Sequence, residues 1–240
     1  MPDMKRLMTL GDRPLARRLS IPVILLAVLL SAALAFGTAG ATIGHGSRAH
    51  DHASTSARAL TARQAKFHDS MRKLWEDHIT WTRLAIVSFA GGLPDLQATE
   101  ARLLANQVDI GNAIKPYYGR TAGNRLTALL KEHILGAVAL LQAAKSGDQT
   151  QIAKASAAWY ANGNQVAGFL HEANPHAWSR AMMRSMMTTH LDQTLAEAQH
   201  RLQGRFADDI RDYEAVHRHI LKMADALSAG IIRQFPQRFR

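Results

Sequence analysis

The fold is decided most clearly by residues 121–146, whose sequence is TAGNRLTALLKEHILGAVALLQAAKS. Placing successive residues 100° apart on a helical wheel gathers the large apolar side chains on one face. That face consists of Leu126, Leu130, His133, Ala137, Leu140 and Ala144. A stripe of this kind is stable only when it packs against other apolar surface, so the stretch predicts an amphipathic α-helix inside a larger assembly.

The same 3.6-residue periodicity continues on both sides of this stretch, interrupted by a few Gly, Pro and Asn positions. Alternation of Val, Ile or Thr, which is typical of strands, is missing from the sequence. The expected fold class is all-α, an antiparallel bundle of about six helices joined by short connections. The expected spans are 57–90, 95–117, 121–146, 149–172, 176–203 and 206–234.

Several expected helix ends carry suitable capping residues. Pro94-Asp95 precedes the second helix, Asp148 precedes the fourth, and Asn174-Pro175 precedes the fifth. Asp and Asn cap helix N-termini by accepting backbone N–H groups, and Pro is favoured at the first helical position. These residues therefore predict where the helices start.

The N-terminus has the pattern of an export signal. Residues 1–20 carry five basic and two acidic side chains, and residues 21–36 carry no charge. Small residues extend the charge-free span to residue 44, about long enough to cross a bilayer. We therefore expect a basic cytoplasmic segment (1–20), a transmembrane anchor or signal peptide (21–44), a polar linker (45–56) and an extracytoplasmic helical bundle (57–240).

Two fates of residues 21–44 remain open. Ala39-Gly40-Ala41 matches a small-x-small cleavage site, and cleavage near Ala41 would yield a secreted bundle. Without cleavage, the segment is a single-pass anchor in the cell membrane, with the N-terminus in the cytoplasm and the bundle outside. The length of the apolar span favours the anchor.

Composition excludes several classes of function. The 240 residues include no cysteine, which excludes disulfides, thiolate metal sites and covalently attached c-type haem. The net charge is +10, and 24 basic and 17 acidic residues remain beyond residue 44. Because these charges are spread along helices, nucleic acid is not an expected partner. The membrane is the expected partner of the N-terminal helix, and a protein partner or a second copy stays open.

Histidines fall on the inward faces of four expected helices. His78, His133 and His217 share the apolar faces of the first, third and last helices, and His190 lies at the margin of the apolar stripe of the fifth. His219 is expected to point to solvent. For each inward histidine, hydrogen bonding to a backbone carbonyl or a Tyr within the core is the alternative to a ligand role.

Two carboxylates accompany these histidines. Glu214 lies one turn before His217, and Glu197 shares the line of His190. A buried imidazole needs a partner for each ring nitrogen, and a metal with carboxylate support meets that need. The predicted metal site therefore consists of His78, His133, His190, His217, Glu214 and Glu197. Glu214-x-x-His217 has the spacing used by di-metal bundles, but it occurs once where that pattern needs two copies.

The expected cofactor is a transition metal (iron, copper or zinc) or non-covalent haem. Four methionines among residues 182–187 precede His190 and would suit copper(I), although methionines at helical spacing also fill cores. Phosphate-binding, nucleophile-elbow and metalloprotease motifs are missing from the sequence. These features favour a binding, sensing or redox role over hydrolysis. The alternative is a cofactor-free structural or protein-interaction bundle.

A resemblance to a known family rests on five short motifs. They are Trp75-Glu76-Asp77-His78 with Trp81-Thr82-Arg83, Trp159-Tyr160-Ala161-Asn162, His190-Leu191-Asp192, Met223-Ala224-Asp225 and Gln234-Phe235-Pro236. Over roughly residues 70–236 the chain resembles an uncharacterised bacterial all-helical family with W-E-x-H-x-x-W-T-R and H-L-D motifs. Some members are labelled glycosyltransferase or acetylglutamate kinase. The resemblance implies an all-helical fold, whereas those activities would need an α/β sheet that the periodicity does not predict.

Overall fold

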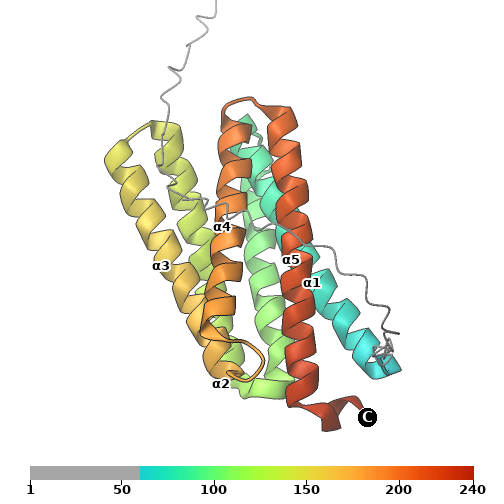
Figure 1. Cartoon of the computed structure of the whole chain (residues 1–240). Helices are drawn as coiled ribbons and strands as arrows, with labels where there is room; N and C mark the ends of the chain where they lie inside the picture. Colours follow the sequence, from blue (N-terminus) through green and yellow to red (C-terminus); the bar gives the residue numbers. More distant parts are fainter. Residues whose placement is uncertain (1–59) are drawn as a thin grey trace, which may run out of the picture. The chain divides into compact units, whose positions relative to one another are not determined.

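A computed structural model describes residues 60–240, which form five α-helices and a short C-terminal 3₁₀-helix (Figure 1). The elements are α1 (Ala62–Gly91), α2 (Leu96–Ser146), α3 (Gln149–Ala173), α4 (Arg180–Leu202), α5 (Phe206–Gln234) and η1 (Pro236–Phe239). The helices pack antiparallel, so the predicted all-α bundle is confirmed. The predicted segments 1–20, 21–44 and 45–56 lie outside the described residues.

The long helix α2 doubles back on itself at Gly119, whose φ of 84° and ψ of 169° are not helical. The Thr127 hydroxyl donates to the carbonyl oxygen of Gln107 over 3.5 Å, although the two residues are 20 positions apart. A Cβ atom on Gly111 would lie 2.6 Å from the carbonyl oxygen of Gly123, so the two backbones touch near the turn. The second and third predicted helices are thus two antiparallel arms of α2, which explains five helices where about six were expected.

Among the described helices, α2 alone is long and apolar enough by composition to cross a membrane, with a mean hydropathy of 1.3 over its best 18-residue window. Of that window, 39% is buried within the bundle. Core helices of bundles pass the same test because they are also long and apolar. This finding is therefore only weak support for a membrane-spanning role of α2.

Capping decides where α3 and α4 begin. Asp148 accepts two backbone N–H groups of α3, as predicted. The prediction that α4 starts at Asn174-Pro175 is wrong, because Ser179 caps this helix instead. The Asn174 amide donates to the carbonyl oxygen of Gly230 on α5 over 3.0 Å. The Asn174 side-chain oxygen accepts the backbone N–H of Ala177 over 3.2 Å, so this residue caps the turn before α4 rather than α4 itself.

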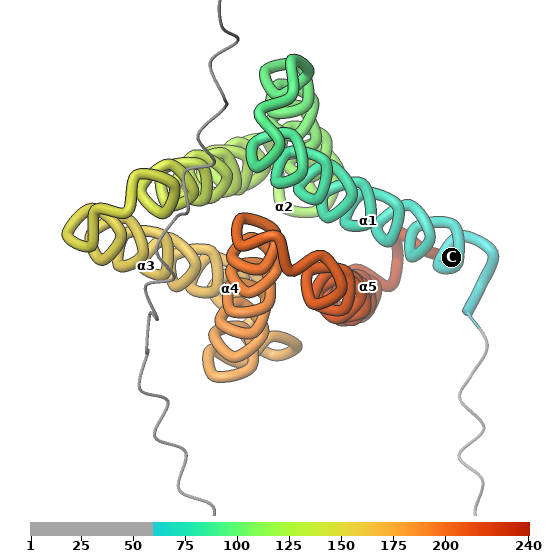
Figure 2. The backbone as a smooth tube through the Cα atoms, turned by 90° about the horizontal axis from the view of Figure 1, so that it is seen from above, coloured from blue at the N-terminus to red at the C-terminus, as the bar shows by residue number. Residues whose placement is uncertain are grey.

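The helices enclose the core as a ring, which the view down the bundle shows in the order α1, α2, α3, α4, α5 (Figure 2). Each helix contacts the next, and α5 closes the ring against α1. The core is mainly apolar, and Trp159 is buried in it. Polar side chains from α1, α2, α3 and α4 interrupt the apolar core. They form the candidate site.

Candidate functional site

Three histidines from different helices meet inside the ring. His78 comes from α1, His133 from the second arm of α2 and His190 from α4, and each is at most 4% exposed. The ring centre of His190 lies 5.7 Å from that of His78 and 5.8 Å from that of His133. His190 therefore contacts both other rings. The predicted inward orientation of these three histidines, called here the histidine cluster, is confirmed.

Amide side chains hold two of the three rings. The Gln107 amide nitrogen lies 3.2 Å from Nδ1 of His78, and Nδ1 of His133 lies 3.2 Å from the amide oxygen of Asn162. The Asn162 amide nitrogen in turn donates to the backbone carbonyl of Leu129 over 3.1 Å. Asn162 therefore orients a buried imidazole.

His190 differs from the other two histidines. Its Nδ1 atom is buried and has no hydrogen-bond partner among the described residues, and the same is true of the amide oxygen of Gln107. A buried polar atom without a partner costs about 1–3 kcal/mol. A ligand that binds the Nδ1 atom of His190 would therefore remove this cost.

All three imidazoles are neutral at pH 7. Burial lowers the pKa of His78 to about 3, helped by neighbouring His133. Burial also lowers the pKa of His133 to about 4, against the opposing effect of its bond to Asn162. The pKa of His190 is well below its ordinary value, first through burial and then through the adjacent histidines. Neutral imidazole is the form that binds metal ions.

Two tryptophans flank the cluster. The ring of Trp159 stacks on that of His133 at 5.4 Å and 23°, and its indole nitrogen donates to the His133 carbonyl oxygen over 3.1 Å. Trp75 meets the ring of His78 edge-on at 5.8 Å. These apolar rings keep water from the imidazoles, which strengthens any electrostatic interaction there.

Glu197 is fully buried, but its partner is an arginine rather than a histidine. Arg83 lies 3.1 Å from a Glu197 oxygen and also pairs with fully buried Asp209, which Arg201 approaches at 3.4 Å. These four residues are called here the ion cluster. Burial raises the pKa of Glu197 to about 7 against the opposing effect of Arg83, and its second oxygen has no partner among the described residues.

The sequence-based orientation of His217 is wrong. Its side chain is 30% exposed and its Nε2 atom lies 3.2 Å from a carboxylate oxygen of Glu76. Glu214 is 62% exposed. The buried line of α5 runs through Val216 and Ile220, so His217 lies one position, or 100°, away from it. Neither His217 nor Glu214 belongs to the histidine cluster.

Sequence reasoning missed two residues near the cluster. Gln107 is fully buried, and the signal that would reveal it is a polar residue within the apolar face of its helix. His219 was expected to point to solvent, yet it is half-buried and its Nε2 atom bonds the Met186 carbonyl oxygen over 2.9 Å. The contact between α4 and α5 decides this orientation, and helical periodicity contains no signal for it.

Three of the five motifs behind the family resemblance contribute residues to the histidine cluster or its neighbours, namely Trp75 with His78, Asn162 and His190. As the side chains lie, no three His, Asp or Glu residues of segment 60–240 form a group that would hold a metal ion. The family resemblance stays a hypothesis. Comparisons of the chain with protein-family models, with curated proteins and with solved structures gave no match.

Proposed function

We propose that the bundle binds one transition-metal ion at His78, His133 and His190, in a binding, sensing or redox role. The observation that carries the proposal is His190, which contacts both other imidazoles and has a buried Nδ1 atom without a partner. Compared with the sequence-based set, His217, Glu214 and Glu197 are left out because each is exposed or paired elsewhere.

The ring spacing supports a shared ion. With metal–nitrogen distances of about 2.0–2.1 Å, two imidazoles on one ion hold their ring centres roughly 5 Å apart in tetrahedral geometry and roughly 6.5 Å apart in linear geometry. The observed 5.7 and 5.8 Å lie within that range. Binding requires the rings to turn so that their nitrogens face one point. Turning His190 breaks no hydrogen bond at Nδ1.

The chemistry of the cluster favours zinc or copper over a carboxylate-bridged di-iron centre. Three neutral imidazoles are ligands that suit these ions, and the buried carboxylate of Glu197 is occupied by Arg83. A single ion also fits rings that already pack against Trp159 and Trp75 better than haem, which would have to separate them. The basic residues 1–20 and charge-free residues 21–44 support anchoring in the cell membrane with the bundle outside.

The test is metal analysis of the full chain purified in detergent, followed by titration with Zn²⁺, Cu⁺ and Fe²⁺. We expect one ion per chain and a raised melting temperature with the preferred ion. His190→Ala should abolish binding, whereas the matched variant His217→Ala, which changes a surface histidine, should keep it. Absence of bound metal, or equal binding by the two variants, would contradict the proposal.

A cofactor-free interaction bundle is the second candidate, and the amide bonds to His78 and His133 favour it. These bonds already satisfy one nitrogen of each ring without any ligand. On this reading, metal ions leave the melting temperature of the full chain unchanged, and His78→Gln is tolerated. The same titration therefore separates the two candidates.

A further inference from the structure

Basic side chains that are spread along the sequence gather at one end of the bundle, called here the basic end. Its four segments are 60–66 at the start of α1, 115–123 around the reversal of α2, 169–184 between α3 and α4, and 230–240 in α5 and η1 (Figure 1). Together they contain nine Arg and Lys residues and one acidic residue, Glu172. All nine basic side chains except that of Lys115 are exposed. The net side-chain charge of the basic end is therefore +8.

Hydrogen bonds between the segments hold the basic end together. The Thr61 hydroxyl donates to the carbonyl oxygen of Phe239 over 3.1 Å, which joins the start of α1 to η1. The Tyr118 hydroxyl donates to the Gln234 side-chain oxygen over 2.6 Å, and the Gln234 amide donates to the Ala173 carbonyl oxygen over 3.1 Å. These bonds join the reversal of α2, the end of α5 and the end of α3. The basic residues therefore belong to one surface.

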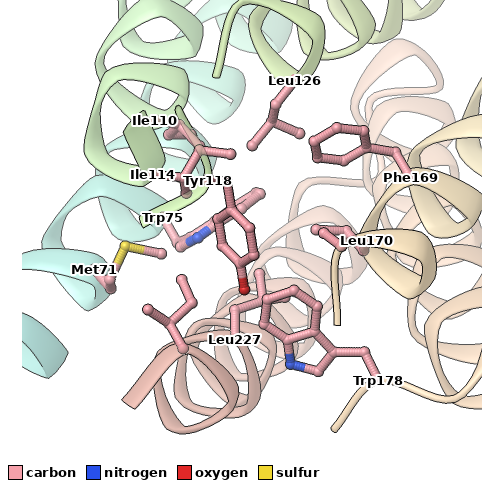
Figure 3. Close-up of a pocket in the computed structure, with 12 residues that line it drawn as sticks. Met71, Trp75, Ile110, Ile114, Tyr118, Leu126, Phe169, Leu170, Trp178 and Leu227 are labelled. Atoms are coloured by element: carbon pink, nitrogen blue, oxygen red, sulfur yellow. The ribbon is translucent and has the colours of Figure 1, made fainter. Parts of the chain in front are cut away.

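The core beneath the basic end also fixes these segments. Trp75, Tyr118 and Trp178 line a small apolar cavity there (Figure 3), and the ring centres of Tyr118 and Trp178 lie 6.3 Å apart. The volume of about 20 Å³ leaves no room for a ligand much larger than water. The packed rings keep the backbone of the basic end in place, so binding to it would order little besides the basic side chains.

The opposite end of the bundle has a different charge. The helix ends and connections there, residues 87–100, 142–153 and 198–210, contain three basic and five acidic residues. Two of the basic residues, Arg201 and Arg205, pair with neighbouring aspartates. At the basic end, by contrast, none of the nine basic side chains pairs with a carboxylate within residues 60–240. Its charge is therefore free to attract an anionic surface.

The connection to residues 21–44 favours a membrane as that surface. Because α1 begins at the basic end, the charge-free segment joins the bundle here through residues 45–61. These residues span at most about 60 Å when fully extended. Anchoring of residues 21–44 would therefore hold the basic end near the bilayer at a high effective concentration.

We infer that the basic end binds the anionic phospholipid headgroups of the membrane in which the chain is anchored. The basic residues come from four segments rather than from one groove, which suits a plane of many phosphates. Each Lys or Arg near such a surface strengthens binding by about fivefold. The inference rests on the proposed anchoring of residues 21–44 and is independent of the proposed metal.

The test uses the full chain, whose lack of cysteine allows single fluorescent labels. Gln237→Cys places a label in the basic end, and Gln203→Cys places the matched label at the opposite end, both at exposed positions. The vesicles consist of phosphatidylcholine, alone or mixed two to one with phosphatidylglycerol, and carry a quencher on some headgroups. We expect several-fold stronger quenching of the position 237 label in the anionic vesicles, and no such difference for the position 203 label. Raising NaCl from 0.1 to 1 M shortens the screening length from about 10 to about 3 Å and should remove the difference.

Two triple variants, each labelled at position 237, test the role of the basic residues. Lys66→Gln with Arg120→Gln and Arg238→Gln should lower the ratio of bound to unbound basic end by at least about 10-fold. The matched control changes three exposed basic residues elsewhere and should keep the ratio within about twofold; it is Lys154→Gln with Arg218→Gln and Lys222→Gln. Equal melting temperatures of the two variants would show that both are folded.

Flotation with the neutral vesicles tests the anchoring separately. A chain that fails to float would contradict the anchoring, while the position 237 label on anionic vesicles still tests the headgroup contact. Equal quenching of this label in both kinds of vesicle, or quenching that ignores the first triple variant, would overturn the inference. If soluble poly-glutamate changes the signal of this label and anionic vesicles do not, the basic end binds an acidic protein and the inference is wrong.

Discussion

The histidine cluster and the ion cluster share helices α1 and α4 and bury polar groups in opposite ways. His78 and Arg83 belong to α1, and His190 and Glu197 belong to α4. The histidines avoid charge altogether, because burial lowers the pKa of each. In the ion cluster, Arg83 pairs with both Glu197 and Asp209, so opposite charges compensate one another, although burial still raises the pKa of Glu197. Neutral imidazoles can bind a cation, whereas carboxylates that already pair with arginine are poor ligands for one.

The largest effect should come from breaking the ion cluster. Arg83→Ala leaves the fully buried carboxylates of Glu197 and Asp209 without their shared cation. We expect the free energy of unfolding to fall by about 3–5 kcal/mol, measured by urea denaturation. The control is Lys73→Ala, which breaks an exposed pair with Asp77 and should cost less than about 0.5 kcal/mol. Equal losses for both variants would contradict the prediction.

The histidine cluster should make the fold sensitive to acid. The pKa of His78 is about 3 in the folded protein and near 6.5 in the unfolded chain. As the pH falls from 6.5 towards 4, the unfolded chain therefore takes up a proton that the folded protein does not. The free energy of unfolding should fall by about 1.4 kcal/mol per pH unit for each such histidine. In urea titrations at pH 7, 6 and 5, the free energy of unfolding of His78→Gln should depend less steeply on pH than that of the parent protein. An unchanged pH dependence would refute this account.

Glu197 should have the opposite pH dependence. Its pKa is about 7 in the folded protein against 4.5 ordinarily, so between these values the folded protein holds a proton that the unfolded chain has lost. The free energy of unfolding should therefore decrease as the pH rises, by about 1.4 kcal/mol per pH unit at most. Glu197→Gln removes this pH dependence. The difference in the free energy of unfolding between the variant and the parent protein should therefore shift in favour of the variant from pH 5 to pH 7 in the same titrations. A constant difference would count against a raised pKa.

The smallest expected effect is a difference in stability loss between variants of two members of the histidine cluster. His133→Leu leaves the amide oxygen of Asn162 without its partner, and we expect a loss of about 1–3 kcal/mol. His190→Leu removes a nitrogen that has no partner, so it should cost less than about 1 kcal/mol. Thermal unfolding of both variants without metal measures the difference. A larger loss for the position 190 variant would mean that His190 has a bonding role in the metal-free protein.

The helical wheel predicted burial correctly for a histidine at the centre of an apolar stripe, and wrongly for a histidine beside one. His133 is surrounded along its helix by Leu126, Leu130 and Leu140, and all of them are buried. Ile210 falls on nearly the same line of the helical wheel as His217, seven residues earlier, but it is 52% exposed. An apolar residue at the start of α5 therefore moved the inferred face by one position.

Glu197 shows that helical periodicity predicts the burial of a side chain but not its bonding partner. Its burial follows from its position in line with His190 on α4, but its partner Arg83 lies 114 residues away on α1. A single helix contains no information on which neighbour meets its polar positions. The same holds for Asn174, whose bond to Gly230 joins α3 to α5.

The sequence by itself determined the helical fold, the turn near Gly119 and the burial of His78, His133 and His190, because local periodicity and backbone freedom act within one segment. Only the tertiary structure decided that these three imidazoles meet, that Glu197 pairs with Arg83 and that a cavity remains beside Trp75. These features depend on the rotation and height of one helix relative to another. Packing of the whole core sets those quantities, and no single segment contains them.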